Sequence, residues 1–219
     1  MLKECILSIC RQIPEDLNYE IIITDDGSDD KTDEIVSSLI SERRNIKYYK
    51  QIHKGIASAR NLCIKKSSYD ILAFIDDDCV VDDHWIYNIL KVYQDYPDEI
   101  VFQGSLLNVQ NANWLQQAYK RLINIYIDLL IEPKDSSGRI HINTFGCNFT
   151  ARKDLFVKYG LFDEDFKSAC EDRDFLQKLL KNKQKILYVP QITATHLYPK
   201  DMINFIGQQI DYGDCCEIG

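Results

Sequence analysis

Two short apolar runs each end in a cluster of aspartates, and this pattern limits the fold more than any other feature of the sequence. The run at 19–24 (YEIIIT) leads into residues 25–26 (DD), and the run at 70–75 (DILAFI) leads into residues 76–78 (DDD). A continuous apolar run indicates a strand buried on both faces, as in a parallel sheet. Adjacent carboxylates repel each other and are poor strand formers. The second cluster therefore indicates either caps for a loop or a positively charged partner at the strand end.

Helical periodicity alternates with such strands through the first half of the chain. Apolar spacing predicts helices over 2–13, 30–44, 55–66 and 84–94, with further strands over 46–51 and 99–107. The second half is less regular, with helices predicted over 113–131, 152–159 and 171–181, a strand over 185–190, and a strand or extended loop over 142–151. This alternation indicates an α/β sheet with right-handed crossovers. No linker-like stretch divides the chain, so we expect one domain.

The helix predicted at 2–13 has no strand before it in the sequence. In a parallel sheet this helix should be the crossover from an earlier strand into the run at 19–24. We therefore expect an inner position of the sheet without its strand, and with it an incomplete nucleotide pocket.

Charge and cysteine usage exclude several classes of protein. The formal net charge is -8, which argues against a general nucleic-acid binder. The eight cysteines form no CxxC pair and no signal peptide precedes them, so we expect reduced thiols in a cytoplasmic protein, with a zinc site as the weaker alternative. The longest apolar run, 122–131, is shorter than a membrane span and carries Asp128.

The acidic clusters are predicted to face one crevice. In open α/β sheets, ligands bind beyond the carboxyl ends of the strands. Carboxylate oxygens at that edge would hold Mg²⁺ or Mn²⁺, which in turn would hold a diphosphate. The alternative is that these residues only cap the helices that follow, which stays open above all for Asp29 and Asp30.

Five segments in order resemble the GT-A glycosyltransferases of the family 2 type. They are EIIITDDGSDDKT, KGIASARNLCIKKSSYDILAFIDDDC, FGCNFTARKDLFVKYGLFDEDF, CEDRDFLQKLL and YVPQITATH, which together span residues 20–196. The resemblance implies an α/β GT-A (Rossmann-like) fold, with a mostly parallel central sheet flanked by helices, as a single domain over 1–219. It also implies that the family's usual first strand is missing, and the chain ends abruptly at CCEIG.

The resemblance assigns the nucleotide-sugar site residue by residue. Asp25 and Asp26 match the acidic pair that contacts the nucleobase and ribose, and Arg60 matches an arginine that reaches the nucleotide. Within the DxD motif, Asp76 and Asp77 are expected at the nucleotide sugar. Arg60 could instead be an ordinary solvated helix residue.

Asp78, in the same motif, is expected at the metal together with His196, which follows the last strand. The cofactor would be Mn²⁺ or Mg²⁺. A divalent cation there offsets the charge that builds on the leaving diphosphate. His196 could instead be an ordinary histidine at a strand end, and the loop 146–148 (GCN) either lines the acceptor side or is a plain turn.

Glu171 and Asp172 match the family's ED pair at a helix start. An attacking sugar hydroxyl must lose its proton, so a nearby carboxylate can serve as base. Asp172 is the expected base and Glu171 supports the site. The alternative is a first helical turn that is rich in acid because of the helix dipole. A single base facing the donor implies inversion at the anomeric carbon.

The expected function is metal-dependent inverting glycosyl transfer in cell-surface glycan synthesis. The donor would be a nucleoside-diphosphate sugar, with a UDP-sugar expected, and the acceptor a glycan, a lipid-linked sugar or a protein, at the inner face of the membrane if the protein associates peripherally. Two alternatives stay open: a non-catalytic remnant that binds nucleotide sugars, and a sugar nucleotidyltransferase, for which the sequence lacks the glycine-rich loop.

Overall fold

The computed structural model describes residues 1–12, 17–108, 113–136, 139–142, 146–167 and 169–197. The first half alternates helices and strands as predicted: α1 Leu2–Cys10, β1 Ile21–Asp25, α2 Thr32–Glu42, β2 Ile46–Lys50, α3 Ile56–Lys66 and β3 Ile71–Phe74. The second half contains β4 Cys79–Val81, α4 Trp85–Asp95, β5 Val101–Asn108, α5 Trp114–Leu130, β6 Phe149–Arg152, α6 Lys153–Tyr159, α7 Glu171–Lys181 and β7 Leu187–His196. The end of the helix predicted at 2–13 and the abrupt carboxyl end lie outside the described residues.

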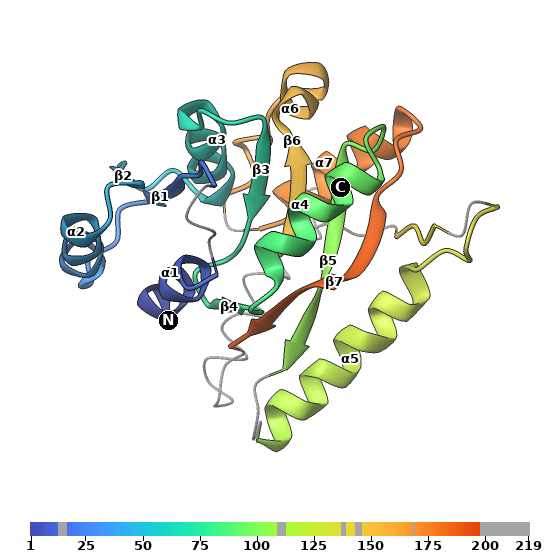
Figure 1. Cartoon of the computed structure of the whole chain (residues 1–219), viewed down its shortest axis with the longest axis horizontal. Helices are drawn as coiled ribbons and strands as arrows, with labels where there is room; N and C mark the ends of the chain where they lie inside the picture. The colour runs from blue at the N-terminus through green and yellow to red at the C-terminus, as the bar shows by residue number, and fades with distance from the viewer. Residues whose placement is uncertain (13–16, 109–112, 137–138, 143–145, 168, 198–219) are drawn as a thin grey trace.

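The strands form two separate sheets (Figure 1). β1 and β2 make a two-stranded parallel sheet, and the larger sheet has the order β3-β6-β5-β7-β4. The α/β class is confirmed, but the expectation of a mostly parallel sheet is wrong for the larger sheet. There, only β5 and β7 are parallel, whereas β6 runs against both β3 and β5, and β4 runs against β7. The short β4 and β6 reverse direction without long crossovers, which strand patterns alone do not reveal.

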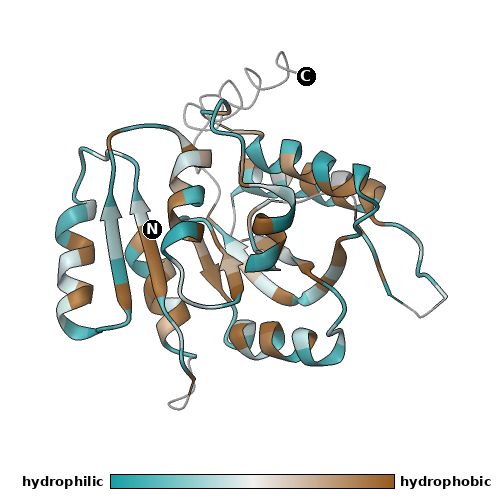
Figure 2. Ribbon diagram, turned by 90° about the horizontal axis from the view of Figure 1, so that it is seen from above, coloured by the Kyte–Doolittle hydropathy of each residue, from teal (hydrophilic) through white to brown (hydrophobic). Residues whose placement is uncertain are grey.

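Two apolar cores cover the faces of the larger sheet. On one face, rings from β3, β6, α6 and α7 pack together, with Phe74 and Phe149 stacked at 4.4 Å and Phe156 and Phe175 at 5.3 Å between ring centroids. The other face packs against α4 and α1. Figure 2 shows the apolar stripes of these helices beside polar ones, as expected for amphipathic helices on a sheet.

Asn148 fixes the centre of the larger sheet. Its fully buried side chain accepts from Trp85 Nε1 at 2.7 Å and donates to the carbonyl oxygens of Ser105 and Ile192 at 2.8 and 2.9 Å. These bonds join α4, β5 and β7 where the β5–β7 register shifts after Gly104. A side chain at Gly104 would place its Cβ 2.3 Å from the Ile192 oxygen, so only glycine fits there. This junction sets the course of β7 and hence the position of His196.

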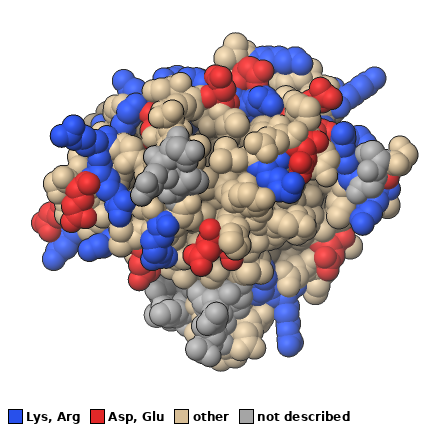
Figure 3. Space-filling model, viewed as in Figure 1, with Lys and Arg blue, Asp and Glu red and all other residues tan. Residues whose placement is uncertain are grey.

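The surface and the helices bear on two of the predictions. On the face in Figure 3, basic and acidic side chains are interspersed, with no broad patch of one sign. None of the helices in the described part of the chain is both long enough and apolar enough to cross a membrane.

Candidate active site

A cavity of about 840 Å³ lies between β1 and β3, and most of the predicted site residues line it. It opens beside the carboxyl ends of both strands, where the two acidic clusters sit. The predicted residues on its wall are Asp25, Asp26, Arg60, Asp76, Asp77, Asp78 and His196. The sequence-based expectation that both clusters face one crevice is therefore confirmed.

Arg60 connects this cavity to the ED pair. From the middle of α3, its guanidinium donates to Asp76 Oδ1 at 3.1 Å through Nη2 and to Glu171 Oε1 through Nη1. It also lies over the ring of Phe162, with 5.9 Å between Cζ and the ring centroid. The side chain is 12% exposed, so Arg60 is not the solvated helix residue of the alternative interpretation. Its charge holds together carboxylates that are 95 residues apart in the chain, since Asp76 and Glu171 would otherwise repel each other.

Glu171 and Asp172 begin α7 but have different surroundings. Glu171 is 2% exposed, and its Oε2 has no hydrogen-bond partner among the described residues. Burial raises its pKa, an effect that Arg60 opposes and Asp172 reinforces. Asp172 is half-buried; burial also raises its pKa, again opposed by Arg60. A carboxyl pKa raised toward neutral suits a group that must accept a proton.

The approach to Asp172 is shaped by glycine and by strained backbone. A Cβ on Gly146 would lie 3.1 Å from Asp172 Oδ2, so the bare glycine leaves this oxygen room. Cys170, just before the ED pair, has φ of 72°, which is unusual for a residue other than glycine. Such conformations persist where the surrounding structure imposes them, and they cluster at functional sites.

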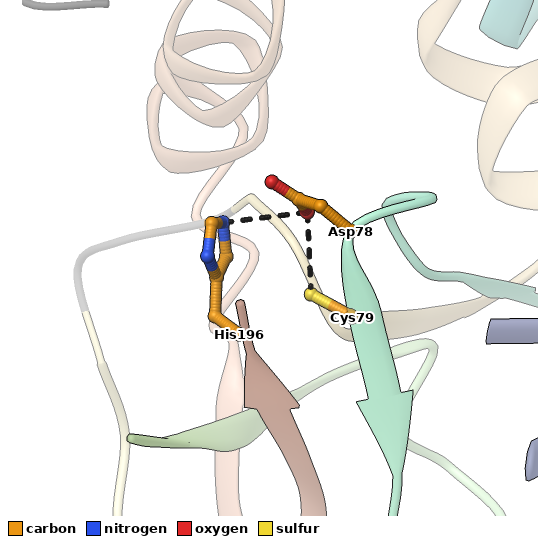
Figure 4. A group of neighbouring side chains, drawn as sticks. All are labelled: Asp78, Cys79 and His196. Atoms are coloured by element: carbon orange, nitrogen blue, oxygen red, sulfur yellow. Dashed lines mark hydrogen bonds and ion pairs between the residues drawn. The ribbon is translucent and has the colours of Figure 1, made fainter. Parts of the chain in front are cut away.

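Asp78, Cys79 and His196 form a compact group of metal-binding side chains (Figure 4). One ligand atom from each lies within 4.8 Å of the others. His196 Nε2 is 3.5 Å from Asp78 Oδ1, and the backbone pairing of Cys79 with His196 in the β4–β7 ladder brings the two strands together. Burial raises the pKa of Asp78, His196 opposes this, and Asp76 and Asp77 reinforce it. A carboxylate crowded by other carboxylates gains from a cation, so the residues fit a divalent metal.

Cys79 was not predicted as a member of this group. The sequence placed it directly after the aspartates, but the cysteines were interpreted as small core residues. Its Sγ lies 3.3 Å from that of Cys147, and both thiols are close to Asp78. The strand pairing that brings Cys79 to His196 is not visible in the sequence.

Asp25 and Asp26 are engaged by their own loops. Asp25 accepts from Ser28 N at 2.7 Å and from the Tyr48 hydroxyl, and pairs with Lys50 at 3.3 Å. Burial works against its ionisation, but the hydrogen bonds from Tyr48 and Ser28 outweigh it and lower the pKa to about 2.

Asp26 accepts the backbone N–H groups of Lys54 and Gly55 at 2.9 and 2.8 Å and the side chain of Gln51 at 2.6 Å. It also pairs with His53, a residue to which sequence reasoning gave no role. Most acceptor positions of Asp26 are thus used to fold the loop before α3, since a carboxylate offers about four. Likewise, the buried Asn148 binds the core rather than an acceptor, which settles one residue of the loop 146–148 as structural.

The sequence pattern of a known family matches most of the chain. The pattern described as "Glycosyl transferase family 2" matches residues 1–160. The chain belongs to this family. Among curated relatives, the minor teichoic acid biosynthesis protein GgaB of Bacillus subtilis is 28% identical over 193 residues, which cover 84% of this chain and 20% of the relative. The chain spans about half or less of the length of the first curated relatives it matches.

Solved structures of family 2-type enzymes share the GT-A fold of this chain. GalNAc-T7, solved with UDP, GalNAc and Mn²⁺, superposes with a TM-score of 0.68 at 17% identity, covering 90% of this chain and 41% of that one. Residues 1–349 of S. aureus TarS, solved with UDP, superpose with a TM-score of 0.67 at 20% identity, covering 89% and 55%. The GT-A class predicted from the five segments is thereby confirmed.

Proposed function

We propose that the chain carries the donor-binding and catalytic part of a glycosyltransferase that moves a sugar from a nucleoside-diphosphate sugar to a hydroxyl acceptor. The observation that carries this proposal is the joining of Asp76 to Glu171 through Arg60, which connects the DxD cavity to the ED pair. Neighbours in fold were solved with UDP and UDP-GlcNAc, which supports a UDP-sugar donor. GgaB is named for teichoic acid biosynthesis, which supports a cell-surface glycan as the product.

The donor would lie across the carboxyl ends of β1 and β3. Asp76 and Asp77 contact the nucleotide sugar there, and the turn after β1, shaped by Asp25 and Asp26, lies against the nucleobase and ribose. Arg60 orients Asp76 and supplies a fixed positive charge near the diphosphate. Because its fork already serves two carboxylates, its effect on the donor is chiefly electrostatic.

Asp172 is the proposed base. Its half-buried carboxylate accepts the proton of the acceptor hydroxyl as that oxygen attacks the anomeric carbon. Glu171, held by Arg60, keeps the start of α7 in place and adds negative charge that reinforces the raised pKa of Asp172's site. One base on one side of the donor implies a single displacement, with inversion of the anomeric configuration.

Asp78 and His196 would hold Mn²⁺ or Mg²⁺, with the Cys79 thiol close by. A cation bound there offsets negative charge on the departing diphosphate. The neighbour solved with Mn²⁺ and UDP supports this assignment. The carboxylate favours the hard ions, whereas imidazole and thiol favour softer ones, so the metal preference is a measurable property of this site.

The test separates donor binding from turnover. Asp172→Asn should bind the UDP-sugar in Mn²⁺ as the unaltered chain does, but release UDP at least ~10²-fold more slowly, the usual scale for loss of a general base. Asp78→Ala should lose the Mn²⁺-dependent part of donor affinity in calorimetry while keeping the far-UV circular dichroism of the fold. Asp174→Asn, on the same helix and paired only with Lys178 in an exposed contact, is the matched control.

Two outcomes would contradict the assignment. If Glu171→Gln abolishes turnover while Asp172→Asn leaves it unchanged, the base is Glu171. If the unaltered chain binds UDP-sugars but releases no UDP with any glycan, lipid-linked or protein acceptor, the chain is a binding remnant rather than an enzyme.

A further inference from the structure

Two strand edges face the cavity between the sheets. β1 pairs with β2 along one edge, and β3 pairs with β6 along one edge. No strand in the described ranges pairs with the other edge of either one. Residues from the whole of both strands line the cavity. Backbone N–H and C=O groups at a strand edge need partners and form a template for another strand.

The walls of the cavity are apolar above and below these edges. α1 contributes Leu2, Cys5, Ile6 and Ile9, and α3 contributes Ile56, Ala59, Cys63 and Ile64. The polar groups gather at the end where the strands meet the aspartates. The space is therefore bounded by two helices and two strand edges, which are the four surroundings of an inner strand in an α/β sheet.

The exposure of β1 and β3 shows the same vacancy in the packing. Both were predicted to be buried on both faces. Instead, the first four residues of β1 are only partly buried, and Ala73, in the middle of β3, is exposed. An exposed alanine inside a sheet, on a cavity wall with apolar neighbours, indicates a position that a further strand would cover.

The direction of a strand in this space follows from its neighbours. Glu20, just before β1, accepts from the backbone N–H of Ser68, just before β3, so the amino ends of the two strands lie together. At the other end, Cys5 in the first turns of α1 donates to the carbonyl oxygen of Asp76 at 3.6 Å. A strand parallel to β1 and β3 would end beside the start of α1, which then runs back toward β1 as a crossover helix.

We propose that this cavity seats a β-strand formed by an extended apolar segment joined to the amino end of α1. The strand runs parallel to β1 and β3, pairs with both, and joins the two sheets into one. Its length is about that of its neighbours, which have five and four residues. Since both of its faces are covered by helices, it consists of consecutive apolar, β-branched residues, followed by a short polar loop near Asp76.

The experiment compares the 219-residue chain with a version extended before Leu2 by six Val, Ile and Thr residues and a short polar loop. The matched control carries the same extension with prolines at its two central positions. Hydrogen exchange at the amides of β1 and β3 should slow at least ten-fold in the extended chain only, and its melting temperature should rise by at least about 5 °C. Equal behaviour of the two extensions would overturn the proposal, as would amides of β1 and β3 that are already fully protected in the 219-residue chain.

Ala73→Arg tests the seat itself. Because Ala73 is exposed, the substitution should leave the melting temperature of the 219-residue chain within about 1 °C, but it should remove the gain that the extension brings. A gain that survives Ala73→Arg would place the extension elsewhere and overturn the proposal. Full protection of β1 and β3 by the free six-residue peptide, without the covalent link, would show that the seat takes a separate chain and would overturn the assignment to α1.

Discussion

Replacing Arg60 with methionine should cost about 3 kcal/mol of folding free energy, nearly all of it through Glu171. Removing one partner of a buried ion pair costs about 3–5 kcal/mol because the other charge stays buried and uncompensated. The Glu171 side chain is 2% exposed and meets this condition, whereas that of Asp76 is 37% exposed and loses less than about 1 kcal/mol. The lower end of the range applies because Glu171 can escape the cost by taking up a proton.

That escape gives the loss a pH dependence with a definite sign. Burial already raises the pKa of Glu171 and Arg60 opposes it, so loss of Arg60 raises the pKa further. The folded state then binds more protons than the unfolded state, and its stability falls as pH rises. Urea denaturation should therefore show a larger penalty for Arg60→Met at pH 8 than at pH 5.5.

The double variant Arg60→Met, Glu171→Gln isolates the pair. Glutamine keeps the shape of the side chain without its charge, so the double variant should be more stable than Arg60→Met alone, with a coupling of about 1–3 kcal/mol. Additive losses would refute the reasoning, and so would a penalty below about 1 kcal/mol or one that is the same at both pH values. Arg60→Lys should retain only part of the stability, because one ammonium cannot reach both carboxylates in the geometry of the guanidinium fork.

Three further predictions concern the scaffold. Asn148→Ala should destabilise the chain by about 3 kcal/mol in urea denaturation, because three buried hydrogen bonds are lost; Asn148→Gly, which also suits the φ of 62°, should lose nearly as much if those bonds dominate. The lowered pKa of Asp25 stabilises the fold above its ordinary value of 3.8, and this is lost as pH falls toward about 2, so Tyr48→Phe should unfold at higher pH in an acid titration. Gly55→Ala should lower the melting temperature by several degrees, because φ is 99° and the new Cβ would lie 2.5 Å from the Lys167 oxygen.

Periodicity was enough to predict the local elements of this chain. The strand ahead of Asp76 and the helix that begins with Glu171 were both predicted because apolar spacing and acidic ends are properties of neighbouring residues. The direction of β6 was not predictable, since its four residues pair with strands far away in the sequence on both sides. The split between β1 and β3 was anticipated from the first helix, which has the apolar face of a crossover but no strand before it.

The site shows the same division between local and long-range information. Motif order placed Asp78 and His196 together, and the structure brings them within 3.5 Å. It could not reveal that Cys79 joins them, because this depends on the register of β4 against β7. It could not show that Asn148 is consumed by the core either, since its three partners come from three separate elements.

The division of the sheet also bears on how the chain comes apart. The stretch from β1 to β2 is continuous in sequence, forms its own two-stranded sheet and shares a small core of Ile6, Cys10, Leu39 and Ile46 with α1. A unit of this kind can open without disturbing the rest of a protein. Calorimetry should then show a low-temperature transition that releases the Asp25 turn while the pairing of β4 with β7 survives. Partial heating would remove the nucleoside end of the site first and leave its metal-binding end folded.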